Sequence, residues 1–246
     1  MTAMVQIPSS PIKAGKALRP RDAASLLLID RSGSKPRILM GRRHASLAFM
    51  PGKFVFPGGR ADPIDGTIGA TAELNRNDVA KLLAGMGARA SLRRARALGL
   101  CAIRETFEET GLRIGQAASK PVTPPAHADW SAFFDNGMIP ALSSLRYFAR
   151  AITPPGNIRR FDARFFIAFR DHIPELDGQA LAPSGELEDL DWVSIDRIDK
   201  LDVARITKTI LEEACALLTN ARFELPATLP VVQYCKRHGR SVREVI

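Results

Sequence analysis

Blocks of apolar residues separated by turn-forming residues run along the chain and predict a mixed α/β fold. Apolar runs of about four to eight residues, bounded by Gly, Pro, Ser or Asn, are typical of buried strands. The first two runs flank the turn-like segment 31–36, so we expect them to form a hairpin. Strands are predicted at 23–30, 37–42, 54–56, 145–152, 163–170 and 190–195.

Longer segments repeat apolar residues at intervals of three and four and therefore predict helices. The longest begins near Ser91 and ends at Gly111, because glycine just past the last helical residue is the usual C-terminal stop. A second one, at 203–219, carries a single apolar stripe made of Ile206, Ile210, Ala214 and Leu217. Further helices are predicted at 77–85, 130–134 and, over the basic tail, 229–246.

Length and composition fit a globular protein that buries a full core. The chain has 246 residues, of which 46% are hydrophobic and 25% are charged, and these values argue against wholesale disorder. No apolar run approaches the length of a membrane span, and the basic segment 1–22 lacks the apolar stretch of a secretory signal. The three cysteines are odd in number and widely spaced, so we expect free thiols and a cytoplasmic location.

The net charge of +9 favours anionic partners such as phosphates and nucleotides. The basic residues are scattered, and none of the basic segments is interleaved with aromatic residues in the way that grips single strands. We therefore expect neither a nucleic-acid partner nor a membrane partner.

The segment RETFEETGL at 104–112 carries the clearest chemistry. Glu105, Glu108 and Glu109 are spaced i, i+3 and i+4, which places three carboxylates on one face of a helix. A divalent cation would remove their mutual repulsion, since Mg²⁺ prefers oxygen ligands and acidifies a bound water. Arg104 lies four residues before Glu108 and is expected to pair with it. The alternative is a solvated acidic helix end, which opposes the helix dipole by about 0.3–1 kcal/mol per charge.

This segment resembles the second half of the Nudix box, G-x5-E-x7-R-E-U-x-E-E-x-G-U, where U is a bulky aliphatic residue. Thr106 departs from the pattern at a U position, while the matching residues are Arg104, Glu105, Glu108, Glu109, Gly111 and Leu112. Gly59 is the expected box glycine, but it precedes Arg104 by 45 residues instead of 14. The box is therefore interrupted by 31 additional residues, and its first glutamate has no clear counterpart.

An insertion at this place is similar to the peroxisomal coenzyme A diphosphatase branch of the Nudix hydrolases. The stretches 43–59 and 160–166 also resemble that branch, with Arg43 and Gly52 at the spacing of its coenzyme A motif. Two positions depart from the motif, since Ala48 replaces an arginine and His44 replaces a small residue.

The resemblance implies an α/β/α sandwich with a mixed sheet, a helical insertion and C-terminal helices. It divides the chain into a flexible basic arm at 1–22, a hydrolase domain at 23–200 that contains the insertion 60–90, and a helical extension at 201–246.

The resemblance also implies residue roles. The expected ligands of Mg²⁺ (or Mn²⁺) are Glu105, Glu108, Glu109 and the carbonyl of Gly58. The expected catalytic residues are Glu105, Glu109, Glu186 and Arg104, with Glu105 and Glu186 as the alternative bases. A guanidinium group can donate two parallel hydrogen bonds to phosphate oxygens. The expected substrate contacts are Arg43, Gly59, Arg160 and Arg164. Each of these arginines could equally be a surface charge.

The expected activity is metal-dependent cleavage of the pyrophosphate in a small nucleoside-diphosphate-linked substrate, with coenzyme A or an acyl-coenzyme A as the first candidate. Alternatives with the same chemistry are ADP-ribose, NADH and dinucleotides. A module that senses a nucleotide without cleaving it, and an RNA-processing hydrolase, are rivals from other classes. A homodimer is compatible with the resemblance.

Overall fold

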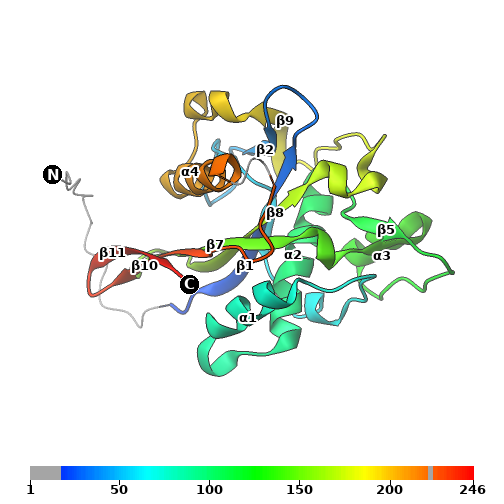
Figure 1. Ribbon diagram of the computed structural model, residues 1–246, viewed down its shortest axis with the longest axis horizontal. Helices are drawn as coiled ribbons and strands as arrows, with labels where there is room; N and C mark the ends of the chain where they lie inside the picture. Colours follow the sequence, from blue (N-terminus) through cyan, green and yellow to red (C-terminus); the bar gives the residue numbers. More distant parts are fainter. Residues whose placement is uncertain (1–17, 221–223) are drawn as a thin grey trace.

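A mixed nine-stranded sheet forms the centre of the computed structural model, which describes residues 18–220 and 224–246 (Figure 1). Its strands are β1 (Arg21–Asp30), β2 (Arg37–Arg43), β3 (Phe54–Val55), β4 (Gly58–Arg60), β7 (Arg146–Ile152), β8 (Phe161–Phe169), β9 (Leu187–Ser194), β10 (Val232–Arg237) and β11 (Arg240–Val245). They lie in the order β11-β10-β7-β8-β1-β2-β3, with β4 paired to β1 and β9 paired to β2. All six predicted strands are present, and β1 and β2 form the predicted antiparallel hairpin.

The long strand β1 lies at the centre of the sheet and pairs in parallel with β8. Its residues Leu26, Leu27, Leu28 and Ile29 are all fully buried. A parallel strand covered on both faces needs a continuous apolar run rather than an alternating one, which explains the sequence LLLI. Residues 21 and 22, expected in a flexible arm, already belong to this strand, while residues 1–17 of that arm lie outside the described part of the chain.

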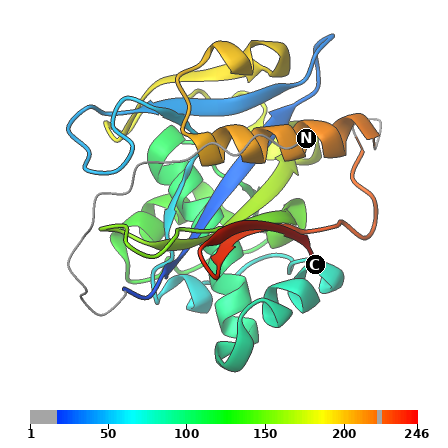
Figure 2. The ribbon, with the colours of Figure 1, turned by 90° about the vertical axis from the view of Figure 1, so that its left-hand side faces the viewer.

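Helices cover both faces of the sheet, which confirms the α/β/α sandwich. They are α1 (Arg76–Ala84), α2 (Leu92–Thr110), α3 (Ala128–Phe134) and α4 (Arg205–Asn220). Figure 2 shows α4, in orange, on one side of the sheet and α1 and α2 on the other. None of the helices in the described part of the chain is both long and apolar enough to cross a membrane.

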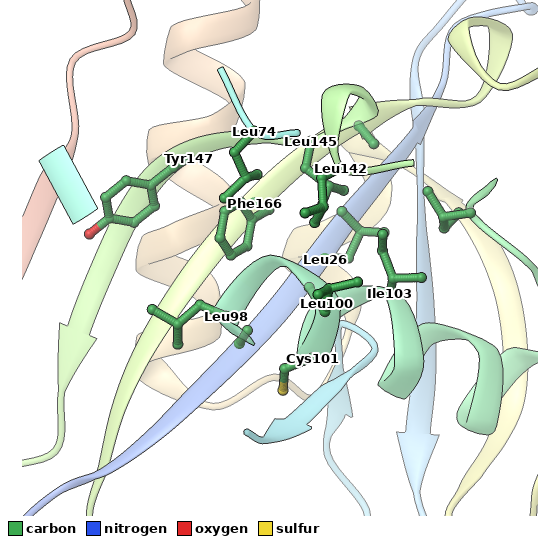
Figure 3. Close-up of a cluster of buried hydrophobic side chains, with 14 of the residues drawn as sticks. Leu26, Leu74, Leu98, Leu100, Cys101, Ile103, Leu142, Leu145, Tyr147 and Phe166 are labelled. Atoms are coloured by element: carbon green, nitrogen blue, oxygen red, sulfur yellow. The ribbon is translucent and has the colours of Figure 1, made fainter. Parts of the chain in front are cut away.

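Alternate residues of β1 enter two separate cores. Leu26 and Leu28 pack in the core beside α2, whereas Leu27 and Ile29 pack in the core beside α4. Figure 3 shows the first core, where Leu26 and Phe166 of the sheet meet Leu98, Leu100, Cys101 and Ile103 of α2. This packing fixes one side of α2 against the sheet.

The long predicted helix is present as α2 and has defined ends. The side chain of Ser91 accepts a hydrogen bond from the backbone N–H of Arg94, which caps the first turn. Gly111 ends the helix in the left-handed conformation with φ of 77°, and its N–H donates to the carbonyl of Phe107. The predicted short helices are present as α1, which lies in the insertion, and α3.

The C-terminal tail is a β-hairpin, so the prediction of a helical extension over 201–246 is wrong beyond α4. Strands β10 and β11 pair antiparallel, and β10 adds in parallel to β7 at the edge of the sheet. His238 and Gly239 have φ of 47° and 80° and form the two-residue connection. Positive φ at both positions matches the twist of a hairpin. The tail is stabilised by backbone pairing of β10 with β7, with Val231 and Val232 buried, and it forms no helical stripe. A second, two-stranded sheet consists of β5 (Gly115–Ala117) and β6 (Met138–Pro140).

Truncation of a buried residue of α4 is expected to destabilise the fold. Ile210 is fully buried in the core beside α4, and Ile210→Ala should lower the free energy of unfolding by about 2–5 kcal/mol. Urea denaturation checks this value. The control Glu212→Ala changes an exposed residue of the same helix and should shift stability by less than about 0.5 kcal/mol. Equal effects of the two variants would contradict the placement of α4.

Candidate active site

A pocket of about 870 Å³ lies at the C-terminal half of α2. One wall is α2, a second is the start of α3, and the third is the segment 179–186 that leads into β9. Glu105, Glu108 and Glu109 all line this pocket, as their spacing predicts. Pockets of this size accommodate small-molecule ligands.

The three carboxylates are unusually costly to ionise in this place. Burial raises the pKa of Glu105 to about 7, and the negative charge of Glu108 adds to the rise. Burial also raises the pKa of Glu108, and it raises that of Glu109 well above its ordinary value, with a further contribution from Glu105. Carboxylates that share a desolvated site oppose one another's ionisation, and a cation placed among them would stabilise the charged forms.

The buried guanidinium of Arg104 holds two of the three carboxylates. Its Nη1 donates to Oε1 of Glu105 and to Oε1 of Glu108, both at 2.9 Å. Its Nε and Nη2 donate to the two carboxylate oxygens of Asp65 at 2.8 and 3.0 Å. The side chain of Arg104 is only 7% exposed. The predicted pairing with Glu108 is therefore present, and it is one part of a larger buried cluster.

The backbone of Gly58 and Gly59 packs directly on the carboxylates. The N–H of Gly58 donates to Oε2 of Glu109 at 2.8 Å. A Cβ on Gly59 would lie 2.4 Å from the carboxylate of Glu105, and a Cβ on Gly58 would lie 2.3 Å from Oγ of Ser25. Gly58 also has φ of 155°. Only glycine permits this close approach, which explains the glycine pair at the start of β4.

Comparison with known proteins identifies the fold of the chain. No protein-family model matches the chain. The chain is similar to the crystal structure of a Nudix hydrolase from Alicyclobacillus acidocaldarius, with 27% identity over 85% of this chain and 98% of that chain, and a TM-score of 0.62. The chain has the Nudix fold. It also matches the Nudix domain of Shewanella oneidensis NrtR, which was solved with ADP-ribose, at 13% identity over 82% of this chain and 90% of that chain, with a TM-score of 0.46.

Asp65 is a further acidic residue of the buried cluster around Arg104, and it is not among the site residues predicted from the sequence. Five residues separate Gly59 from Asp65, as in the pattern G-x5-E, so the spacing contained the signal. Asp65 is fully buried, and besides Arg104 it accepts a hydrogen bond from Nε1 of Trp130 at 3.0 Å. Its contact with Arg104 makes Asp65 a candidate for the glutamate position of this pattern, while the interruption of the box by 31 residues stays a prediction.

Glu186 and Arg43 also lie near the carboxylates of α2. Glu186 lines the pocket, and its charge is among the causes that raise the pKa of Glu109, while the charge of Arg43 opposes that rise. The backbone N–H of His44 donates to the carbonyl of Glu186 at 3.0 Å, which keeps the two segments adjacent. Nε of Arg43 donates to the carbonyl of Phe49.

Arg160 and Arg164 do not line this pocket, so the structure gives no support to their predicted role as its phosphate contacts. Arg164 is 1% exposed and pairs with Asp22 at 3.1 Å and with Asp162 at 2.9 Å. Asp22 also binds Arg94 near the start of α2, eleven residues and thus on the order of 16 Å along the helix from Glu105. Arg160 lines a different, smaller pocket. Residue type alone did not distinguish a ligand contact from a buried ion pair.

The donor set of the pocket fits a hard divalent cation. Within residues 18–220 and 224–246, no three Asp, Glu, His or Cys side chains are already gathered as a closed cage. The carboxylates instead bind Arg104 and the N–H of Gly58. All the candidate ligands are nevertheless oxygen atoms, which Mg²⁺ and Mn²⁺ prefer. Their raised pKa values give a physical reason for a cation at this place.

The raised pKa predicts a stabilising substitution. A rise from 4.5 to about 7 for Glu105 means that its ionisation disfavours the folded state by on the order of 3 kcal/mol. Stability falls as pH rises from 4.5 to about 7, because over this range the unfolded chain loses the proton while the folded chain retains it. In EDTA at pH 8, Glu105→Gln should therefore raise the free energy of unfolding by about 1–3 kcal/mol.

Chemical denaturation at two pH values checks this prediction. The gain should disappear at pH 4, where both states carry the protonated acid. A variant that is less stable than the wild type at pH 8 would show that ionised Glu105 stabilises the folded chain.

Proposed function

We propose that this chain is a hydrolase dependent on Mg²⁺ or Mn²⁺ that cleaves the pyrophosphate of a small nucleoside-diphosphate-linked substrate. The observation that carries the proposal is the set of three carboxylates on α2 that share one pocket, two of which are held by a buried arginine. The similarity to the Alicyclobacillus acidocaldarius hydrolase supports a hydrolase that acts on a phosphorus-containing anhydride.

In the proposed reaction, a water oxygen attacks one phosphorus and the bridging P–O bond breaks, which releases two phosphorylated products. A bound divalent cation supplies charge neutralisation and acidification of the attacking water. Glu105, Glu108 and Glu109 would hold it, together with the carbonyl of Gly58. Arg104 fixes the carboxylates of Glu105 and Glu108, so these ligands need little reorganisation when the cation binds.

Two carboxylates are candidates for the base that accepts the proton of water. Glu105 is largely shielded from solvent, and its pKa of about 7 without a cation makes its carboxylate a ready proton acceptor near neutral pH. Glu186 is exposed and lies on the segment that borders the pocket, where it can reach a substrate-bound water without giving up a ligand position.

Within this class we propose coenzyme A or an acyl-coenzyme A as the substrate. The support is the motif at 43–59, whose Arg43 lies close enough to Glu109 to affect its pKa and could bind a substrate phosphate. ADP-ribose, NADH and dinucleotides would require the same chemistry at the same carboxylates. The presence of all three box carboxylates favours a hydrolase over a module that only senses a nucleotide.

Loss of a box carboxylate is expected to abolish most of the turnover. Glu108→Gln and Glu109→Gln should each lower kcat by about 10²-fold or more, which corresponds to about 3 kcal/mol in the barrier. The measurement is product formation, read by mass, from coenzyme A, an acyl-coenzyme A, ADP-ribose, NADH and diadenosine polyphosphates. EDTA should stop the reaction, and the exposed control Glu212→Gln should leave it unchanged.

The panel separates the proposed activities. Release of phosphopantetheine from coenzyme A supports the proposed substrate. Cleavage of only another compound of the panel supports the proposed mechanism and identifies a different substrate. Tight binding of one member without cleavage would favour the sensing module. Full activity of both Glu→Gln variants would contradict the assigned metal ligands.

Removal of the buried charge beside Arg104 is expected to impair turnover. Asp65→Asn retains the shape of the side chain but leaves Arg104 without its buried counter-ion. The guanidinium should then reorient, and kcat should fall by about tenfold or more with a smaller change in KM. Steady-state kinetics at saturating Mg²⁺ check this. The exposed neighbour Asp62 provides the control Asp62→Asn, and equal kcat values for the two variants would argue against a positioning role for Asp65.

A further inference from the structure

A second pocket, of about 250 Å³, lies where the end of β7, the turn that follows it and the strand β10 meet. It shares no residue with the pocket of the carboxylates. Figure 1 shows β10 and β11 at the opposite end of the molecule from α3, which borders the carboxylate pocket. The four charged residues that line it are all basic: Arg150, Arg160, Lys236 and Arg237.

The buried Arg150 gives this basic pocket a rigid wall. Its Nε and Nη2 donate to the two carboxylate oxygens of Asp162, both at 2.7 Å. Its Nη1 donates to Oε1 of Gln233 on β10 at 2.8 Å. These contacts join β7, β8 and β10, so the C-terminal hairpin is fixed relative to the rest of the pocket.

Two cations of the basic pocket have no carboxylate partner in the part of the chain that the structure describes. Nε of Arg160 donates to the carbonyl of Thr153 at 3.0 Å, and Nη1 donates to the carbonyl of Leu18. These bonds orient the guanidinium without neutralising it. Lys236 is exposed and forms neither a hydrogen bond nor an ion pair with a described residue. Arg237, in contrast, pairs with Glu244.

We propose that the basic pocket binds a small phosphate-bearing anion, such as a phosphomonoester or a diphosphate, without a divalent cation. An oriented guanidinium and a lysine ammonium on one concave surface are the groups that recognise phosphate oxygens. The carboxylate pocket needs a metal ion to attract the same anion, whereas this one carries the positive charge itself. Its volume is at the small end for ligand pockets, which favours a phosphate group with a short attachment over a whole dinucleotide.

A small molecule fits these observations better than a nucleic acid. Sites that follow a single strand combine basic residues with aromatic side chains for base stacking, and no aromatic residue lines the basic pocket. This site is also independent of the proposed hydrolase activity, since none of the box residues takes part in it.

Titration calorimetry with inorganic pyrophosphate in EDTA tests the proposal. The wild-type protein should bind one equivalent saturably, and the carboxylate variant Glu109→Gln should bind equally well. Lys236→Ala and Arg160→Ala should each weaken the affinity by at least tenfold. The side chain of Lys236 has no hydrogen bond or ion pair with a described residue to lose, so its variant remains informative if Arg160→Ala disturbs the turn. Lys200→Ala, an exposed lysine outside the pocket, is the matched control.

Three results would overturn the proposal. One is the absence of saturable binding, and another is equal weakening by Lys200→Ala and Lys236→Ala, which would indicate general surface charge only. The third is that the protein binds a single-stranded RNA oligonucleotide but not pyrophosphate, and that Lys236→Ala weakens the RNA binding.

Discussion

The buried guanidinium of Arg104 is the interaction on which the candidate active site depends. It joins Asp65, in the segment between β4 and α1, to Glu105 and Glu108 on α2. Removal of one partner from such a buried pair leaves an uncompensated charge and costs about 3–5 kcal/mol. The cluster therefore fixes the carboxylates in the pocket and also anchors the segment between β4 and α1 to the helix α2.

The same cluster shows how function limits stability in this fold. Its negative charges exceed the positive charge of Arg104, and burial raises the pKa of Glu105 and Glu109. The ionised carboxylates thus disfavour the folded chain until a cation arrives. The apolar side of α2 compensates for this cost, since Leu100 and Ile103 are fully buried against the sheet (Figure 3). The carboxylates thus lie on one face of α2, and the residues that pack it against the sheet lie on the opposite face.

Local signals in the sequence were sufficient for the sandwich and for the carboxylate helix. The apolar run of β1, the stop at Gly111 and the spacing of Glu105, Glu108 and Glu109 each depend on neighbours in the chain. The spacing of Asp65 from Gly59 contained a signal for this residue, but its contact with Arg104, 39 positions later, is made only by the fold. The hairpin at the C-terminus was taken for a helix because its pairing with β7 is a tertiary contact. Arg164 was misplaced for a related reason, since its ion pairs come from distant strands.

The central claim is that the carboxylate face of α2 is a site for a divalent cation that must displace protons. Calorimetric titration of Mn²⁺ at pH 7, in two buffers of different ionisation enthalpy, tests it most directly. Because Glu105 has a pKa of about 7 and that of Glu109 is raised further, binding should release protons, and the apparent enthalpy should differ between the buffers. Glu109→Gln should weaken the binding. Identical Mn²⁺ binding by the wild type and Glu109→Gln, with no dependence on the buffer, would contradict the account.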